Sequence, residues 1–170
     1  SYNHITDQSI NALAMYRADT LTELYILPCV QITPAAINNL LHVCTNLNTL
    51  ALSTYNTSSV VDVRLMSRLT KLYVACDDTP CRDLLHDVAE NCTSLREFTT
   101  YITDYSSTTE LDEIVQHCTH LTHLNVEHDG TETVSSDVLA RWRAWRPDLT
   151  VSLEFNIQSE LQSFGSFTWA

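Results

Sequence analysis

The sequence has only two glycines among its 170 residues, Gly130 and Gly165. Phosphate-binding loops, dinucleotide-binding turns and the nucleophile turn of many hydrolases need clustered glycines. The backbone there must approach a ligand closely or adopt a strained conformation. This sequence contains none of these motifs. In addition, no grouping of serine, cysteine, histidine and aspartate indicates a catalytic centre. We therefore expect neither an enzyme nor a bound cofactor.

Basic residues are also scarce, since nine Lys and Arg against 21 Asp and Glu give a net charge of −12. Such a chain repels phosphates, so the expected partner is a protein with a basic surface and not a nucleic acid. No apolar run approaches the roughly 18 residues that span a bilayer, and residues 1–18 lack the pattern of a secretory signal. We expect no membrane partner, a cytoplasmic or nuclear protein, and no modification of the sequons at Asn56 and Asn91.

The main feature that is present is a repeat of the form LxxLxL. Its first leucines are Leu21, Leu47, Leu69, Leu95 and Leu121, with a degenerate sixth copy at Leu149, at intervals of 26, 22, 26, 26 and 28 residues. Intervals of this size accommodate one strand and one helix per repeat.

The segments before Leu47, Leu95 and Leu121 have the period of a helix with one apolar face. The apolar residues occupy identical offsets in all three: Ile37, Leu40, Leu41 and Cys44; Leu85, Val88, Ala89 and Cys92; Leu111, Ile114, Val115 and Cys118. Each cysteine comes three residues before a strand leucine, where a small core side chain is expected. We predict free, buried thiols at Cys44, Cys92 and Cys118, with a disulfide as the alternative.

Helix starts are indicated by Thr33-Pro34 and Thr79-Pro80, in which a threonine cap precedes a proline at the first helical position. Thr109 with Asp112 resembles a capping box. In the short repeat Asp62 interrupts the apolar pattern, so a shorter or irregular helix is predicted there.

These patterns predict an α/β leucine-rich-repeat solenoid, a right-handed superhelix of the ribonuclease-inhibitor type with parallel strands on its concave face. Residues 1–155 would form five to six repeats. Residues 156–170 would form either a cap on the last repeat or a tail that contacts a partner.

The segment His4-Ile5-Thr6-Asp7-x-x-Ile10-x-x-Leu13-Ala14 resembles the helix entry of the cysteine-containing leucine-rich-repeat subclass. Cys44-Thr-Asn-Leu47, Cys92-Thr-Ser-Leu95 and Cys118-Thr-His-Leu121 resemble its strand entry, with threonine where proline is common. After the strands only Cys29 matches the subclass pattern, whereas Tyr55, Asp77, Thr103 and Asp129 depart from it.

This subclass is best known from F-box/leucine-rich-repeat proteins, in which an F-box docks the ubiquitin-ligase adaptor and the repeats hold the substrate. The resemblance implies a substrate-recognition module whose F-box lies outside this chain. The alternative is a scaffold or assembly factor of the same subclass.

Two clusters carry metal-ligand residue types. The first holds His117, Cys118, His120, His123, His128 and Asp129, and the second holds Cys76, Asp77, Asp78 and Cys81. In the expected fold Cys118 faces the core, His117 lies on the outer helix and His123 on the concave face, so the first cluster does not converge. The second cluster is expected to form an ordinary polar turn, and no metal site is predicted in either cluster.

In LxxLxL the leucines point into the core, and the residues between and after them point to the opposite, concave face. The candidate partner-binding residues on that face are Glu23, Tyr25, Leu27, Lys71, Tyr73, Glu97, Tyr101, His123, Asn125 and Glu127. Tyr25 and Tyr73 flank the small Ala51 and would frame a shallow site for a partner side chain. The alternative is that these tyrosines serve only the preference of strands for aromatic residues.

Overall fold

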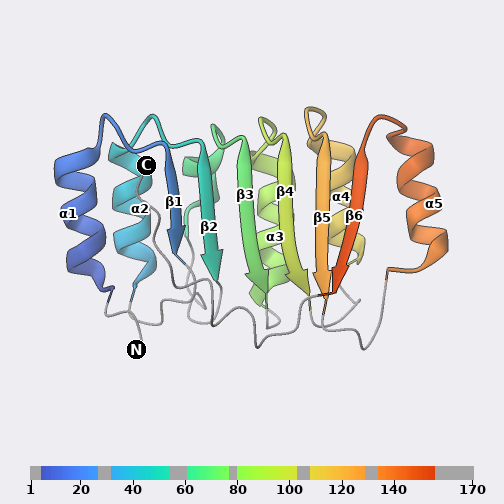
Figure 1. Ribbon diagram of the computed structural model, residues 1–170, viewed down its shortest axis with the longest axis horizontal. Helices are drawn as coiled ribbons and strands as arrows, with labels where there is room; N and C mark the ends of the chain where they lie inside the picture. Colours follow the sequence, from blue (N-terminus) through green and yellow to red (C-terminus); the bar gives the residue numbers. More distant parts are fainter. Residues whose placement is uncertain are drawn as a thin grey trace.

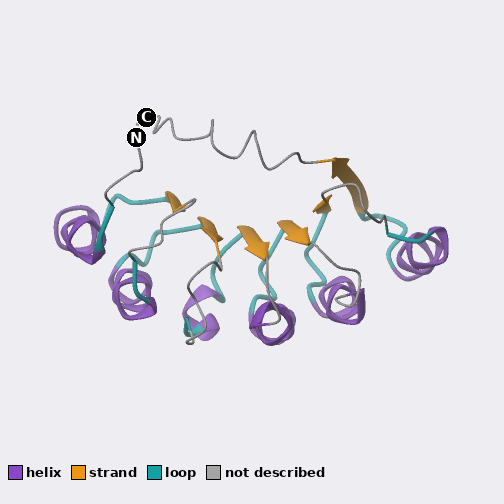
Figure 2. Ribbon diagram, turned by 90° about the horizontal axis from the view of Figure 1, so that it is seen from below, coloured by secondary structure: helices purple, strands orange, loops and turns teal. Residues whose placement is uncertain are grey.

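The computed structural model describes residues 5–26, 32–53, 61–76, 80–102, 108–128 and 134–155. Their strands form one parallel sheet in the order β1-β2-β3-β4-β5-β6, so neighbours in the sequence are neighbours in the sheet (Figure 1). The sheet curves into an arch with the strands inside and the helices outside (Figure 2). The predicted α/β leucine-rich-repeat solenoid is confirmed, with six strands within the described residues.

The strands are β1 (Glu23–Ile26), β2 (Thr49–Ser53), β3 (Lys71–Cys76), β4 (Glu97–Ile102), β5 (His123–His128) and β6 (Thr150–Phe155). The helices are α1 (Asp7–Arg17), α2 (Pro34–Val43), α3 (Pro80–Asn91), α4 (Thr108–His117) and α5 (Ser136–Trp145), with the 3₁₀ helix η1 (Val63–Met66) in the short repeat. The predicted irregularity after Asp62 is therefore confirmed. None of the described helices is long and apolar enough to cross a membrane.

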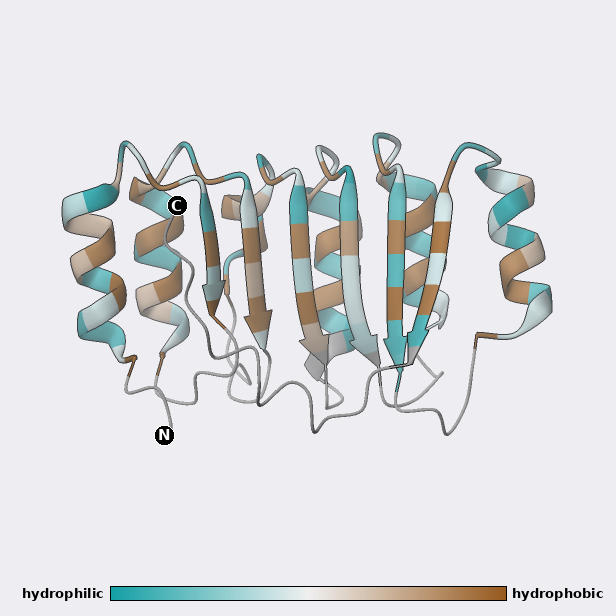
Figure 3. Cartoon of the chain, in the orientation of Figure 1, coloured by the Kyte–Doolittle hydropathy of each residue, from teal (hydrophilic) through white to brown (hydrophobic). Residues whose placement is uncertain are grey.

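The core lies between the sheet and the helices. The second leucine of each LxxLxL motif pairs with its counterpart on the next strand, which places Leu24, Leu50, Leu72, Phe98, Leu124 and Val151 in one row. Leu50 and Leu124 are each only 1% exposed, as the motif predicts. Along β1, β3, β5 and β6 hydrophobic residues alternate with more hydrophilic ones (Figure 3), because successive side chains point to opposite faces of a sheet.

Cys44, Cys92 and Cys118 are free thiols buried in this core, as predicted. The Cys118 thiol donates a hydrogen bond to the backbone oxygen of Cys92 at 3.6 Å. Burial raises the pKa of Cys92 to about 12 and that of Cys118 to about 11, so both stay protonated at neutral pH. Protonated, enclosed thiols pack as small core side chains and are poor nucleophiles.

The helix caps follow the sequence in part. The Thr33 hydroxyl accepts a hydrogen bond from the backbone N–H of Ala36, as expected of a cap before proline. The predicted capping box at Thr109 is wrong, because α4 already begins at Thr108 and Thr109 lies inside it. Asp112 instead accepts hydrogen bonds from the Trp142 indole and from Arg141, both at 2.6 Å, and so links α4 to α5. Thr79 lies outside the described residues.

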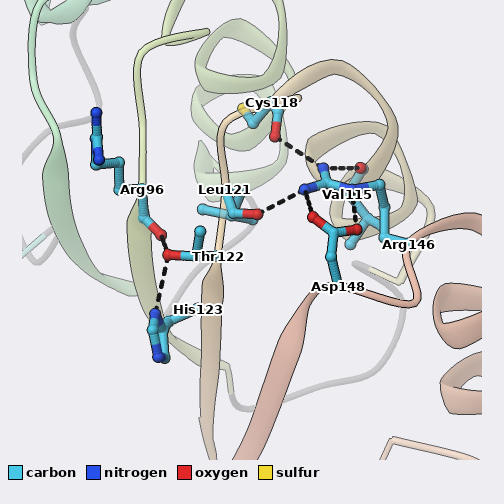
Figure 4. Close-up of polar contacts among 8 residues, drawn as sticks. All are labelled: Arg96, Val115, Cys118, Leu121, Thr122, His123, Arg146 and Asp148. Atoms are coloured by element: carbon cyan, nitrogen blue, oxygen red, sulfur yellow. Dashed lines mark hydrogen bonds and ion pairs between the residues drawn. The ribbon is translucent and has the colours of Figure 1, made fainter.

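Two arginines cap helices of the repeat before their own. Arg146 donates to the backbone oxygens of Val115, Cys118 and Leu121 at 3.5, 3.2 and 2.7 Å, and is held by the Asp148 carboxylate (Figure 4). Arg68 donates to the backbone oxygens of Leu41 and Cys44 at the end of α2. The carbonyls of Leu41 and Val115 lie in the last turn of their helices, where no N–H of the same helix can reach them, so these guanidinium groups supply a donor. The oxygens of Cys44 and Cys118 also accept from the backbone N–H of Leu47 and Leu121.

Candidate functional site on the concave face

The parallel register arranges the concave-face side chains in three rows. The strand-start row is Glu23, Thr49, Lys71, Glu97, His123 and Thr150. The middle row is Tyr25, Ala51, Tyr73, Thr99, Asn125 and Ser152, and the strand-end row contains Ser53, Ala75, Tyr101, Glu127 and Glu154. All candidate residues fall in these rows except Leu27, which lies outside the described residues.

An ion pair stands in the strand-start row. Lys71 Nζ lies 2.9 Å from Glu97 Oε2, with about half of each side chain exposed. The carboxylate of Glu97 raises the pKa of Lys71. Lys71 is the only lysine in the chain, so its ammonium is a single, well-defined feature of this face.

Glu23 and Tyr25 stand on β1, the strand that begins the sheet. The Tyr25 hydroxyl lies 3.4 Å from Glu23 Oε2, and the Tyr25 side chain is 57% exposed. Partial burial and the Glu23 carboxylate raise the pKa of Tyr25, so its hydroxyl remains a donor at neutral pH. An exposed aromatic ring beside a carboxylate offers apolar area and charge to the same partner group.

His123 is the exposed member of the row on β5. Its Nδ1 lies 3.0 Å from the Thr122 hydroxyl, which in turn donates to the backbone oxygen of Arg96 at 3.0 Å (Figure 4). These contacts fix the imidazole at the start of the strand.

The middle of the concave face differs from the prediction. Ala51 pairs with Tyr25 and Tyr73 as expected, but it is only 1% exposed, so no open site lies above it. The Tyr73 hydroxyl donates to Glu127 Oε2 at 3.1 Å, across the intervening strand β4. The Tyr73 ring is therefore directed toward β5 and away from Tyr25, and the two tyrosines do not frame one site.

Tyr101 was predicted as a partner-binding residue on this face, and it is 1% exposed. Its strand neighbours in the same row are Ala75 and Glu127, and the bond from Tyr73 to Glu127 crosses its strand. Tyr101 therefore cannot offer its ring to a partner. In the strand-start row Glu23, Lys71 and His123 are exposed, and the Glu97 side chain is about half exposed. Together with exposed Tyr25 of the middle row, we call these residues the exposed strand-start group. Tyr73, Thr99, Asn125 and Glu127 are half-buried, and Thr150, Ser152 and Glu154 are exposed on β6.

The residues with metal-ligand chemistry are spread through the fold. His117 is exposed on α4, Cys118 is in the core, His123 is on the concave face and His128 is buried. Across the described parts of the chain, no three His, Cys, Asp or Glu side chains gather as a metal site would require. Asp77, Asp78 and Asp129 lie outside those parts.

No protein-family model matches the chain, and no curated protein matches it significantly. Among solved structures it is similar to an internalin from Listeria monocytogenes str. 4b F2365, at 17% sequence identity and a TM-score of 0.30, over 91% of this chain and 71% of that one. Such a TM-score is too low to carry an argument. The leucine-rich-repeat architecture therefore rests on the parallel sheet and on the repeating offsets of its core residues.

Proposed function

We propose that this chain is a protein-interaction module that binds a basic partner through the exposed strand-start group. The observation that supports this is the group itself, in which ionic side chains of the strand-start row and the neighbouring Tyr25 ring are accessible on one curved sheet. Side chains on a packed sheet keep their relative positions, which reduces the entropy lost on binding. Exposed glutamates outnumber the single lysine on this face, and the chain as a whole carries −12, so a basic partner complements it.

The finer proposal is that the module recognises the substrate of an F-box-type ubiquitin ligase in the cytoplasm or nucleus, without catalysis or a cofactor of its own. It rests on the resemblance of the helix and strand entries to the cysteine-containing repeat subclass. The alternative is a scaffold or assembly factor of that subclass. Co-purification of the native full-length protein with the ligase adaptor supports the first, and its absence under conditions that retain other partners supports the second.

The single lysine makes the binding surface testable by cross-linking. A partner retained on the immobilised chain should form amine-specific cross-links that map to Lys71, and Lys71→Arg should abolish the cross-links at that position while keeping the charge. The triple change Glu23→Gln, Tyr25→Ala, Glu97→Gln should weaken partner binding by about tenfold or more, which corresponds to about 1.4 kcal/mol. Raised salt should weaken it as well, because exposed charges are screened.

The matched control is a pair of outer-helix changes, Glu90→Gln with Gln116→Ala, which alters exposed polar residues away from the sheet. All variants are first checked for an unchanged circular dichroism spectrum. If the outer pair releases the partner and the concave triple retains it, the concave-face proposal is wrong.

A further inference from the structure

The end of the sheet at β6 leaves part of the core half-open. Val151 and Leu153 are the core-facing residues of β6, and both are half-buried. Their partners on β5, Leu124 and Val126, are 1% and 0% exposed. β5 lies between two strands, whereas β6 is the last strand of the described sheet and no described strand pairs with its other edge (Figure 1). The core-facing side chains of β6 therefore lack part of the cover that each inner strand has.

The last helix is half-open in the same way. Val138 and Leu139 of α5 pack against the core but remain half-buried, whereas the core residues of α4 are fully buried. α5 and β6 lie at the same end of the arch (Figure 2). We call the four half-buried apolar residues of this last repeat the open end: Val138, Leu139, Val151 and Leu153.

The β6 edge also has few of the features that keep an edge strand from pairing with other chains. It has six residues, as many as β3, β4 and β5, and it contains neither proline nor lysine. β1, at the other end of the sheet, has only four residues. Natural sheets protect a long edge with charges, proline or a bulge, or they cover it with a helix or loop. Glu154 is the only charged residue of β6, so a cover is expected.

The spacing of core residues shows which segment has the side chains for this cover. Val151 lies in the strand row that also holds Leu24, Leu50, Leu72 and Phe98. Two core residues of the following helix come 13 and 16 residues after this row: Ile37 and Leu40, Val63 and Met66, Leu85 and Val88, Leu111 and Ile114. All eight are at most 4% exposed. Phe164 and Phe167 follow Val151 by the same 13 and 16 residues.

The helix α5 departs from this spacing. After Leu124 the same distances reach Asp137 and Ala140, which are both exposed, and the inward-facing Val138 and Trp142 come one position later than their counterparts elsewhere. The short repeat shows that the two positions are sufficient for a cover, because η1 has only four residues and still buries Val63 and Met66. Gly165 would weaken a long helix but not exclude a single turn of this kind.

We propose that Phe164 and Phe167 dock on the open end, so that residues 156–170 form a truncated last repeat that caps the solenoid. These residues lie outside the described residues, and they follow β6 directly in the sequence. Because the segment is tethered to the surface that it covers, docking is intramolecular and needs no second molecule. Two aromatic side chains would supply the apolar contacts that the open end lacks on its outer side.

Hydrogen exchange of the unmodified full chain is the first test. Peptides from residues 156–170 should exchange at least about tenfold more slowly than a free peptide of the same sequence, because burying one phenylalanine stabilises a docked segment by that factor or more. Exchange at the rate of the free peptide overturns the proposal. This measurement needs no variant, so it decides the question even if a variant fails to fold.

The second test locates the docked segment. Phe164→Asp with Phe167→Asp should remove the protection of residues 156–170 and speed exchange in peptides from α5 and β6, while peptides from α3 and β4 stay unchanged. The matched control is Gln162→Asp with Ser166→Asp, which adds the same charge to the same segment. The spacing places these two residues where α3 has Asp83 and Asp87, outside the core, so the control should exchange as the unmodified chain does.

The single lysine separates a cap from a segment that lies over the concave face. Lys71 is about half exposed there, so the rate at which an amine reagent modifies it should be the same in the unmodified chain and in both variants. If the Phe164 and Phe167 changes speed this reaction and leave α5 and β6 unchanged, the segment covers the concave face and the cap is wrong. A control variant that loses protection as the phenylalanine variant does also overturns the proposal. The cap does not depend on the function proposed for the concave face.

Discussion

Arg146 occupies the position at which inner repeats carry Cys44, Cys92 or Cys118, three residues before the leucine that opens the strand. In those repeats the side chain fills the core, whereas Arg146 directs its guanidinium at three backbone oxygens of the preceding repeat. Asp148 holds the other side of the guanidinium at 2.9 Å. The substitution therefore changes an apolar contact between repeats into a hydrogen-bonded one.

Removing this guanidinium should cost stability. Arg146→Ala removes the donor to the Val115 and Leu121 oxygens and one of two donors to the Cys118 oxygen. We therefore expect a loss of about 1–3 kcal/mol in the free energy of unfolding. Arg146→Lys should recover only part of it, because one ammonium cannot reproduce the planar fork. Urea unfolding measures the stability of both variants. The control is Arg143→Ala, because Arg143 is exposed on α5, the helix that Arg146 follows, and its loss should change stability by no more than about 0.5 kcal/mol. Equal stability of the two alanine variants would refute the capping role.

Single residues also show where sequence patterns fail. Strand alternation assigns Tyr101 to the concave face correctly, but it does not report what lies beside it, and the ring is buried. The caps made by Arg68 and Arg146 join residues 24 to 31 positions apart, so no local pattern predicts them. For Arg146 the sequence does contain one indication. An arginine at the position where other repeats have a core cysteine places a charge near the core, and a buried charge requires hydrogen-bond partners.

At the scale of the elements, neighbouring helices are joined on their outer side by polar pairs. His86 of α3 lies 2.7 Å from Glu113 of α4 and 3.6 Å from Glu90 of its own helix. The hydrogen bond and charge of Glu113, with smaller effects from Glu90 and Asp87, raise the pKa of His86. Because the pKa is higher in the folded chain, the charged imidazole stabilises the fold below its ordinary value and this contribution fades as pH rises through the raised pKa.

The free energy of unfolding should therefore depend on pH through His86. We expect His86→Gln to destabilise the chain more at about pH 6 than at higher pH, where the imidazole loses its proton. The Glu113→Gln background should greatly reduce this difference, because the main partner is gone. Urea unfolding of the four variants at several pH values measures the effect. A His86→Gln effect that grows as pH rises would contradict the sign of the argument.

At the scale of the whole molecule, the repeating leucines predict most of the architecture. The first five strands begin two residues after the first leucine of their motif, and the short repeat has a 3₁₀ helix where Asp62 interrupts the pattern. This succeeds because each repeat packs only against its neighbours, so local periodicity determines the global fold. The accessible part of the concave face could not be predicted in the same way, since exposure depends on side chains from several strands, as with Ala51 and the bond from Tyr73 to Glu127.

The short repeat should be the weak point of the solenoid. Its 3₁₀ helix has four residues and stands between α2 and α3, and its Met66 is 1% exposed. Coupling along a solenoid passes only through neighbouring repeats, so a defect here separates its two halves. Met66→Ala should cost about 2–5 kcal/mol and allow the segment from α1 to β2 to unfold at lower urea than β4 and β5.

Hydrogen exchange followed by mass spectrometry at increasing urea resolves the two halves, because each gives its own peptides. Ile114→Ala is the matched control, since it creates a similar cavity in α4, where the helix is regular and the side chain is fully buried. That variant should lose comparable stability, and its weak point should lie around α4 instead of between β2 and β3. The contrary outcome is that, in the Met66→Ala variant, all peptides from α1 to β5 lose protection at one urea concentration. The short repeat would then couple its two neighbours as strongly as the other repeats do.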